Sequence, residues 1–185
     1  GKDVTVMLEL RARFDEENNL AYKELLEEEG VKVLLGIPNQ KVHAKIFLIR
    51  KRKGNHTIHY GFISTGNMNE STATVYGDHC LITANRHIMA DVNRIFLYLE
   101  KPKTGLKHLR LTQTLFLSPT SMRRNILSLI NAEIKNAMAG RKASIMLKMN
   151  SFSDEILIQK LYDAATAGVE IKMVVRGIFC AVTDI

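Results

Sequence analysis

The chain has 185 residues, of which 46% are hydrophobic and 24% charged, an ordinary globular composition that suffices for one large or two small domains. Its 26 lysines and arginines against 19 aspartates and glutamates give a net charge of +7, which favours anionic partners without choosing among them. There is no tryptophan, and 7 phenylalanines with 5 tyrosines are few for a platform that stacks nucleic-acid bases, so nucleic acid is not among the expected partners.

Three further features of the composition narrow the class of protein. No apolar run is long enough for a transmembrane helix. Cys80 and Cys180 lie far apart and lack metal-binding spacing, so buried free thiols in a reducing compartment are expected, with a disulfide between them as the alternative. The sequence begins with Gly1 and enters a strand pattern almost at once, with no signal-peptide layout, which suggests a piece cut from a longer protein.

The first half of the chain alternates strand patterns with helix patterns. Residues 4–10 predict a strand, 15–29 a helix that is capped by Asp15 and ended by Gly30, and 31–35 a second strand. The elements expected next are strands 41–49 and 59–64 around the basic turn 50–55, a polar turn 65–69, a short segment 70–76, a strand 78–83 and a helix 86–99.

The second half begins with an expected linker at 101–105 and extended chain over 109–117. A long helix is expected to start near Ser118 or Thr120, either of which could cap it, and to run through Met138. A strand over 144–149, a helix over 154–167 and a strand over 169–175 complete the chain.

An internal repeat links the two halves. The segments 7–10 and 146–149 match, and each precedes a polar loop, an Asp-Glu pair, a helix, a glycine and a strand. Strand–helix–strand units also resemble one another in any α/β protein, which is the alternative explanation. In the first copy His43 follows the unit, whereas no histidine occurs after His108, so a true repeat predicts a second histidine beyond Ile185.

His43 and Lys45 lie two residues apart in the expected strand 41–49. Side chains at positions i and i+2 of a strand point to the same face, so an imidazole would lie beside an ammonium group. Imidazole is a good nucleophile near pH 7 because its pKa is about 6.5, and it can hold a phosphoryl group covalently. The ammonium would neutralise charge on the phosphoryl oxygens. The alternative is a strand start with two solvated polar residues.

The polar turn 65–69 ends the adjacent strand and contributes backbone and amide donors, while Gly66 permits close approach of the backbone to an oxyanion. The pattern His43-x-Lys45, a hairpin and then Ser-Thr-Gly-Asn resembles the HxK…GxN half-motif of the phospholipase D superfamily, which pairs two such lobes around one site. The sequence departs from that superfamily at Arg50, where an acidic residue usually stands. This departure argues against a plain phosphodiesterase.

A wider set of segments is spread over nearly the whole chain: Glu9–Glu17, Lys41–Lys45, Thr65–Glu70, Ser118-Pro119 with Arg123-Arg124, Leu147–Asn150 and Val174–Gly177. In these segments the chain resembles the bacterial polyphosphate kinases that use ATP to synthesise the polymer. The resemblance implies an α/β fold, a phospholipase D-like α-β-α sandwich. It implies one nearly complete catalytic domain over residues 1–107, truncated at its N-terminus, and the beginning of a second similar domain over 108–185, truncated at its C-terminus.

The same resemblance implies roles for individual residues. His43 would be the phosphohistidine nucleophile, and Lys45 would hold the transferring phosphoryl group. Tyr76 and Arg176 would contact ATP. Arg13 would belong to the magnesium site, and because a guanidinium cannot ligate Mg²⁺, it would hold the phosphate oxygens that bind the metal. The expected phosphate or polyphosphate contacts are Asn67, Asn69, Arg123 and Arg124.

The resemblance implies reversible transfer of the γ-phosphate of ATP, through His43, to the end of an inorganic polyphosphate chain, with Mg²⁺ bridging the phosphates. It implies ATP or ADP and polyphosphate as partners, a homo-oligomer at full length and a bacterial cytoplasmic location, and it leaves peripheral membrane association open. Residues 1–185 alone are expected to be inactive because the second histidine would lie outside them. The alternatives are a phospholipase D-type phosphodiesterase or nuclease and a non-catalytic polyanion-binding module.

The candidate residues also have structural alternatives. Tyr76 would pack at a turn, and Arg176 would be a surface charge at a strand end. The remaining alternatives are a surface ion pair of Arg13 with Asp15 or Glu16, and a solvated pair of Arg123 and Arg124 in the first turn of a helix.

Overall fold

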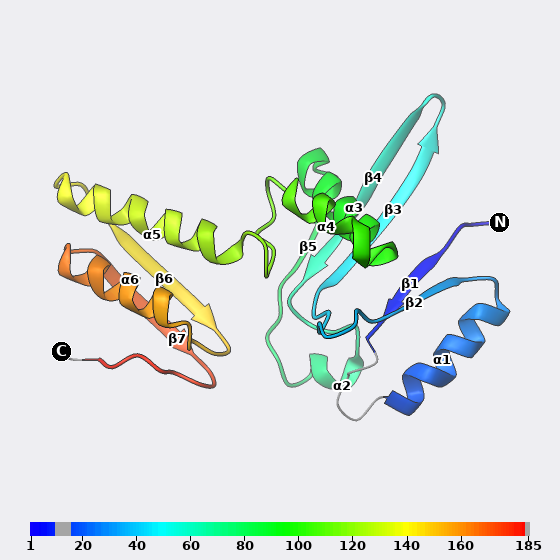
Figure 1. Ribbon diagram of the computed structural model, residues 1–185, viewed down its shortest axis with the longest axis horizontal. Coiled ribbons are helices and arrows are strands. Elements are labelled where there is room, and N and C mark those ends of the chain that lie inside the picture. The colour runs from blue at the N-terminus through cyan, green and yellow to red at the C-terminus, as the bar shows by residue number, and fades with distance from the viewer. Residues whose placement is uncertain (10–15, 184–185) are drawn as a thin grey trace. The chain divides into compact units, whose positions relative to one another are not determined.

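The computed structural model describes residues 1–9 and 16–183, and the chain divides into two compact units, Gly1–Leu115 (unit 1) and Phe116–Ile185 (unit 2) (Figure 1). Both units combine strands with helices, so the expected α/β class is confirmed. Across the described part of the chain, no helix is both long enough and apolar enough to cross a membrane.

Unit 1 contains two separate sheets. Its elements are β1 (Thr5–Leu8), α1 (Glu16–Glu28), β2 (Lys32–Leu35), β3 (Lys45–Lys53), β4 (His56–Ser64), α2 (Glu70–Ala73), β5 (Cys80–Thr83), α3 (Arg86–Glu100) and α4 (Pro102–Arg110). Strands β1 and β2 pair in parallel, whereas β3, β4 and β5 form an antiparallel sheet in that order.

Helix α3 supplies most of the buried core of unit 1. Asn85 caps the helix by accepting hydrogen bonds from the backbone N–H groups of His87 and Ile88. Met89 and Val92, each with 0% of its surface exposed, lie on the apolar face of the helix. This face explains why the helix forms where the 3.6-residue periodicity predicts it.

A buried carboxylate, Asp91, fixes the end of unit 1. It accepts hydrogen bonds from the backbone N–H groups of residues 113–115 at 2.7–3.0 Å and from Arg94. Burial raises the pKa of Asp91, but these donors outweigh that effect and hold the pKa below its ordinary value. The segment after α4 is therefore tied to α3 although it forms no regular element.

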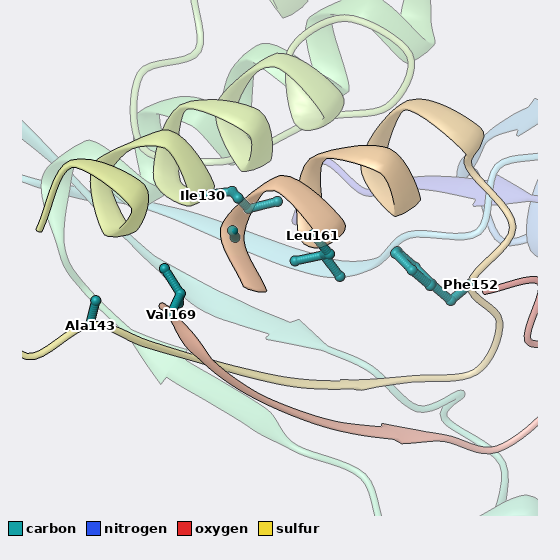
Figure 2. Close-up of a cluster of buried hydrophobic side chains, with 6 residues drawn as sticks. Ile130, Ala143, Phe152, Leu161 and Val169 are labelled. Carbon is teal, nitrogen blue, oxygen red and sulfur yellow. The ribbon is translucent and has the colours of Figure 1, made fainter. Parts of the chain in front are cut away.

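Unit 2 is a strand–helix–strand unit preceded by a long helix. Its elements are α5 (Met122–Met138), β6 (Ser144–Met149), α6 (Glu155–Thr166) and β7 (Glu170–Val175). Side chains of α5 and α6 pack over the parallel pair β6–β7, and Figure 2 shows Ile130, Leu161, Phe152 and Val169 pointing into the shared core. Every second residue of β6 and β7 faces this core, as expected for strands covered on one side.

Both expected strand–helix–strand units are confirmed, while their interpretation as two copies of one repeat stays a prediction. Both β1–α1–β2 and β6–α6–β7 are parallel strand–helix–strand units, and the glycines after their helices, Gly30 and Gly168, have φ angles of 76° and 90°. Only glycine adopts this left-handed conformation without a steric cost from Cβ, which explains why both helices end there.

Several local predictions were wrong. The expected linker 101–105 is the start of α4, and residues 109–117 form no strand, since 109 and 110 end that helix. Ser121 occupies the N-cap position of α5, in place of Ser118 or Thr120. Cys80 and Cys180 are free as expected, but they are exposed, not buried. The predicted cap Asp15 lies outside the described residues.

Candidate active site

His43 and Lys45, which we call the reactive pair after the role expected of them, meet as predicted, although the strand starts later than predicted. Strand β3 begins at Lys45, so His43 lies in the segment just before it and is exposed. The Lys45 Nζ atom lies 2.9 Å from Nδ1 and 3.2 Å from Nε2 of His43, and it donates to the His43 carbonyl oxygen at 2.8 Å. The Lys45 ammonium is thus about equally close to both ring nitrogens. It can therefore contact a group that is bound to either one.

Three strand ends converge beside this pair. In the antiparallel register Lys45 lies opposite Ser64 at the end of β4, and Ser64 lies opposite Cys80 at the start of β5. Residues directly opposite each other in such a ladder project to the same face. The polar turn after β4 and the segment before β5 therefore flank the reactive pair.

The turn after β4 is held by a compact set of hydrogen bonds. Thr65 Oγ1 donates to a carboxylate oxygen of Asp78 at 2.8 Å and accepts from the His79 backbone N–H at 3.0 Å, while the Thr65 N–H donates to the His79 carbonyl at 3.0 Å. A Cβ atom on Gly66 would overlap the Asp78 carboxylate. Glycine is thus required here because the backbone lies against a carboxylate.

The charges around the pair favour a neutral imidazole. Partial burial lowers the pKa of His43 below its ordinary value, and the positive charges of Lys45 and then Lys41 lower it further. Burial and the charge of Lys41 also lower the pKa of Lys45, while the Asp78 carboxylate opposes that shift. A neutral imidazole has the lone pair that a nucleophile needs.

Asp78 is the site residue that the sequence patterns did not reveal. The sequence pattern around Asp78 predicts only a strand. Asp78 also lies 33 positions after Lys45, whereas the acidic residue of the phospholipase D superfamily pattern lies five positions after its lysine. The register was the available signal, because extending the β4–β5 ladder past Ser64 and Cys80 brings Gly66 opposite Asp78. An acidic group near Lys45 is thus supplied by the segment that precedes β5, while Arg50 lies farther along β3.

The other candidates of unit 1 lie close by in the chain. The Asn69 side-chain oxygen caps α2 by accepting from the Thr72 N–H at 3.0 Å and from Ser71 Oγ at 2.6 Å, which leaves its amide nitrogen as a donor. Asn67 is exposed in the same turn. Tyr76 is 47% exposed just after α2, where its N–H donates to the Thr72 carbonyl.

The candidates of unit 2 occupy two places. Arg176 directly follows β7, and its N–H donates to the Met149 carbonyl at the end of β6. Arg123 and Arg124 line an open groove of about 690 Å³ along α5, together with polar residues such as Asn131 and Lys135. The Arg123 guanidinium is already bound to Asp154 at 2.7 and 2.8 Å.

The magnesium site, expected at Arg13 through phosphate oxygens, stays a prediction. Arg13 lies outside the described residues, and among the described residues no three His, Cys, Asp or Glu side chains form a group that could hold a metal ion. Mg²⁺ prefers oxygen ligands and commonly takes them from substrate phosphates. The described side chains therefore do not fit a magnesium site built from protein ligands alone.

Comparison with known proteins decides the family. The model of polyphosphate kinase C-terminal domain 1 matches residues 1–105, and that of polyphosphate kinase C-terminal domain 2 matches residues 115–185. The chain belongs to the polyphosphate kinase family. The expected fold class, a phospholipase D-like α/β arrangement with one domain followed by a second, is confirmed by these matches.

Individual polyphosphate kinases align along almost the entire chain. The polyphosphate kinase of Vibrio cholerae is 45% identical over 177 residues, which are 96% of this chain and 25% of the relative. That of Escherichia coli K12 is 40% identical with the same coverage. The crystal structure of polyphosphate kinase from Porphyromonas gingivalis superposes with a TM-score of 0.82 at 40% identity, covering 100% of this chain and 30% of that one. The chain thus spans about a quarter of the length of the curated relatives it matches.

Proposed function

We propose that this chain carries the phosphohistidine of an ATP:polyphosphate phosphotransferase. The observation that supports the proposal most directly is the contact of the Lys45 ammonium with the ring of a His43 whose pKa is lowered. Family membership supports the same chemistry, because the relatives are polyphosphate kinases. Tyr76 and Arg176 are proposed to bind ATP.

The proposed reaction has two steps. A lone pair of the His43 imidazole attacks the γ-phosphorus of ATP, so that a P–N bond forms while the P–O bond to the β-phosphate breaks and ADP leaves with the electron pair. A terminal oxygen of polyphosphate then attacks the same phosphorus, and the P–N bond breaks. The reverse sequence makes ATP from ADP.

Lys45 acts on the charge of the phosphoryl group in both steps. Its ammonium lies within hydrogen-bond distance of the imidazole, so it can donate to the oxygens of a phosphoryl group that is bound to either nitrogen. Asp78 stabilises the charged form of Lys45 and, through Thr65, fixes the turn that contains Gly66. Asn67, Asn69, Arg123 and Arg124 are proposed as weaker contacts to the phosphates or the polymer.

Mg²⁺ is proposed to enter with the nucleotide, bound by its phosphate oxygens. Arg13 would hold those phosphates and would not ligate the metal. Among the described residues, no group of His, Cys, Asp or Glu side chains could hold the ion without those phosphates. A homo-oligomer, a bacterial cytoplasmic location and peripheral contact with a membrane belong to the same proposal for the whole enzyme.

The test is transfer of the labelled γ-phosphate of ATP to the full-length gene product. We expect an acid-labile, base-stable label on the enzyme and its complete loss in His43→Ala. His87→Ala is the matched control, because His87 is exposed at the start of α3, and it should label normally. Undiminished labelling of His43→Ala would overturn the assignment. Residues 1–185 alone are expected to make no polyphosphate, which the same assay can measure.

A further inference from the structure

The entire net charge of the chain is located in one stretch of its sequence. Between residues 30 and 69 there are seven lysines and arginines and no aspartate or glutamate, and elsewhere 19 cations are matched by 19 carboxylates. This stretch contains the reactive pair and the β3–β4 hairpin. Four of its seven cations, Arg50, Lys51, Arg52 and Lys53, are consecutive and lie at the end of β3.

These four residues belong to a two-stranded ribbon that we call the basic arm, residues 50–59. Strand β5 pairs only with residues 61–64 of β4, so the arm has no third strand beside it, and Figure 1 shows the hairpin extending past β5. All of its residues are exposed except His59, which is half-buried.

The cations of the basic arm are not neutralised within the structure. None of the four forms an ion pair with a residue that the structure describes, and the Arg52 Nε–H donates only to the Gly54 carbonyl, at 3.4 Å. Side chains alternate across the ribbon, so Arg50, Arg52 and His59 project from one face, and Lys51, Lys53 and His56 from the other. Both faces of the arm therefore present positive charge.

We propose that the basic arm is an accessory binding site for long-chain polyphosphate, separate from the reactive pair. The proposal rests on the proposed function, since it takes the polymer to be a substrate. Lys45 and Lys53 are the first and last residues of the same strand. At roughly 3.3 Å per residue they lie about 26 Å apart. Only a long polymer can contact the arm while its end lies at His43.

The composition of the arm favours polyphosphate over other polyanions. Residues 50–59 contain no phenylalanine, tyrosine or tryptophan on which nucleic-acid bases could stack, and Ile58 is their only apolar side chain, too little to enter a membrane. Charges on both faces suit a flexible chain that can wrap around the ribbon better than they suit a flat lipid surface. The ligand class is thus a linear phosphate polymer with neither bases nor acyl chains.

The test is to neutralise the arm in the full-length gene product with Arg50→Gln, Lys51→Gln, Arg52→Gln and Lys53→Gln. The matched control removes four exposed charges at α4 through Lys101→Gln, Lys103→Gln, Lys107→Gln and Arg110→Gln. We expect affinity for long-chain polyphosphate to fall about tenfold in the arm variant and less than about twofold in the control, with a shallower salt dependence in the arm variant only. The Michaelis constant for tripolyphosphate and the labelling of His43 should not change.

The possible results separate this proposal from the proposed function. Unchanged affinity of the arm variant for long-chain polyphosphate, or an equal loss in the α4 control, overturns the accessory site whatever His43 does. Tighter arm-dependent binding of single-stranded DNA than of polyphosphate assigns the arm to nucleic acid instead. Arm-dependent binding of phosphatidylglycerol vesicles without arm-dependent binding of polyphosphate assigns it to a membrane. Because binding is measured without turnover, loss or retention of labelling in His43→Ala leaves these results interpretable.

Discussion

The two strand–helix–strand units of the chain share a topology but differ in packing. In β6–α6–β7, alternate strand residues join a buried cluster that includes Leu161 and Ala164 of α6. In β1–α1–β2, every residue of β1 is only half-buried, and Leu20 and Leu25 of α1 are 50% and 56% exposed. The segment β6–α6–β7 therefore supplies stability through its own core, whereas β1–α1–β2 has few fully buried side chains of its own.

The two strand–helix–strand segments also differ in the part of the chain that follows their second strand. After β2 the chain turns through residues 36–40 and reaches His43, the reactive pair and the antiparallel sheet. After β7 it passes Arg176 and runs back along the unit, where Phe152 and Phe179 stack with ring centroids 6.4 Å apart. The same supersecondary topology thus precedes the proposed site in one case and a packed segment in the other, and the difference comes from the attached segment.

The largest effect should come from the His43–Lys45 pair, which follows β1–α1–β2 in the chain. Lys45→Ala removes the ammonium that contacts the His43 ring, and we expect His43 labelling by ATP to slow by about 10²- to 10³-fold, as for loss of one charge-stabilising donor. Folding stability should change much less than the rate, because the Lys45 side chain is only half-buried. Rapid-quench labelling measures the rate, and chemical denaturation measures the stability.

Lys41→Ala is the control for this substitution. Lys41 is exposed and affects the pair only through its charge, so its removal should change the labelling rate by no more than severalfold. Equal losses in the two variants would mean that general positive charge, and not the contact of Lys45 with the ring, supports the reaction.

The packing side of the comparison predicts the next effect. Leu161→Ala removes a side chain that is 6% exposed in the core of unit 2, and it should lower the free energy of unfolding by about 2–5 kcal/mol. Leu25→Ala removes the same atoms from an exposed position in α1 and should change that free energy by no more than about 0.5 kcal/mol. Urea denaturation of the two variants provides the measurement. Similar decreases in the free energy of unfolding would show that β1–α1–β2 is packed as tightly as β6–α6–β7.

The sequence predicts those parts of the fold that local physics decides. Asn85 and Asp154 lie at helix starts, and each accepts hydrogen bonds from the first turn, while Gly30 and Gly168 end helices with positive φ. The His43–Lys45 contact also follows from local spacing. These features depend on residues a few positions apart.

Features that depend on long-range contacts were missed or misassigned. Gly105 suggested a linker, but it is buried where α4 packs on α3, and a Cβ there would approach Tyr98 Cα to 2.9 Å. The glycine allows two helices to approach closely and does not mark a turn. Asp78 and Asp91 act on residues brought to them by a strand ladder and by a chain reversal, respectively. No local pattern identifies such partners.

The smallest expected effect is a shift in the pH dependence of His43 labelling. The pKa of His43 is lowered, so its reactive neutral form should persist below the ordinary midpoint of about 6.5, and the labelling rate should fall only at lower pH. The pKa of His43 is lower in the folded chain than in the unfolded chain, so the unfolded chain takes up the proton first as the pH falls. The free energy of unfolding should therefore decrease as pH falls below about 6.5.

Lys45→Ala tests the cause of that shift. Burial is the largest cause of the lowered pKa and the charge of Lys45 comes second, so removal of the charge should raise the midpoint of the pH–rate profile without restoring it to about 6.5. A matched profile of Lys41→Ala should move in the same direction by less. If neither substitution moves the midpoint, the lysines do not tune the imidazole, and Lys45 acts only on the phosphoryl group.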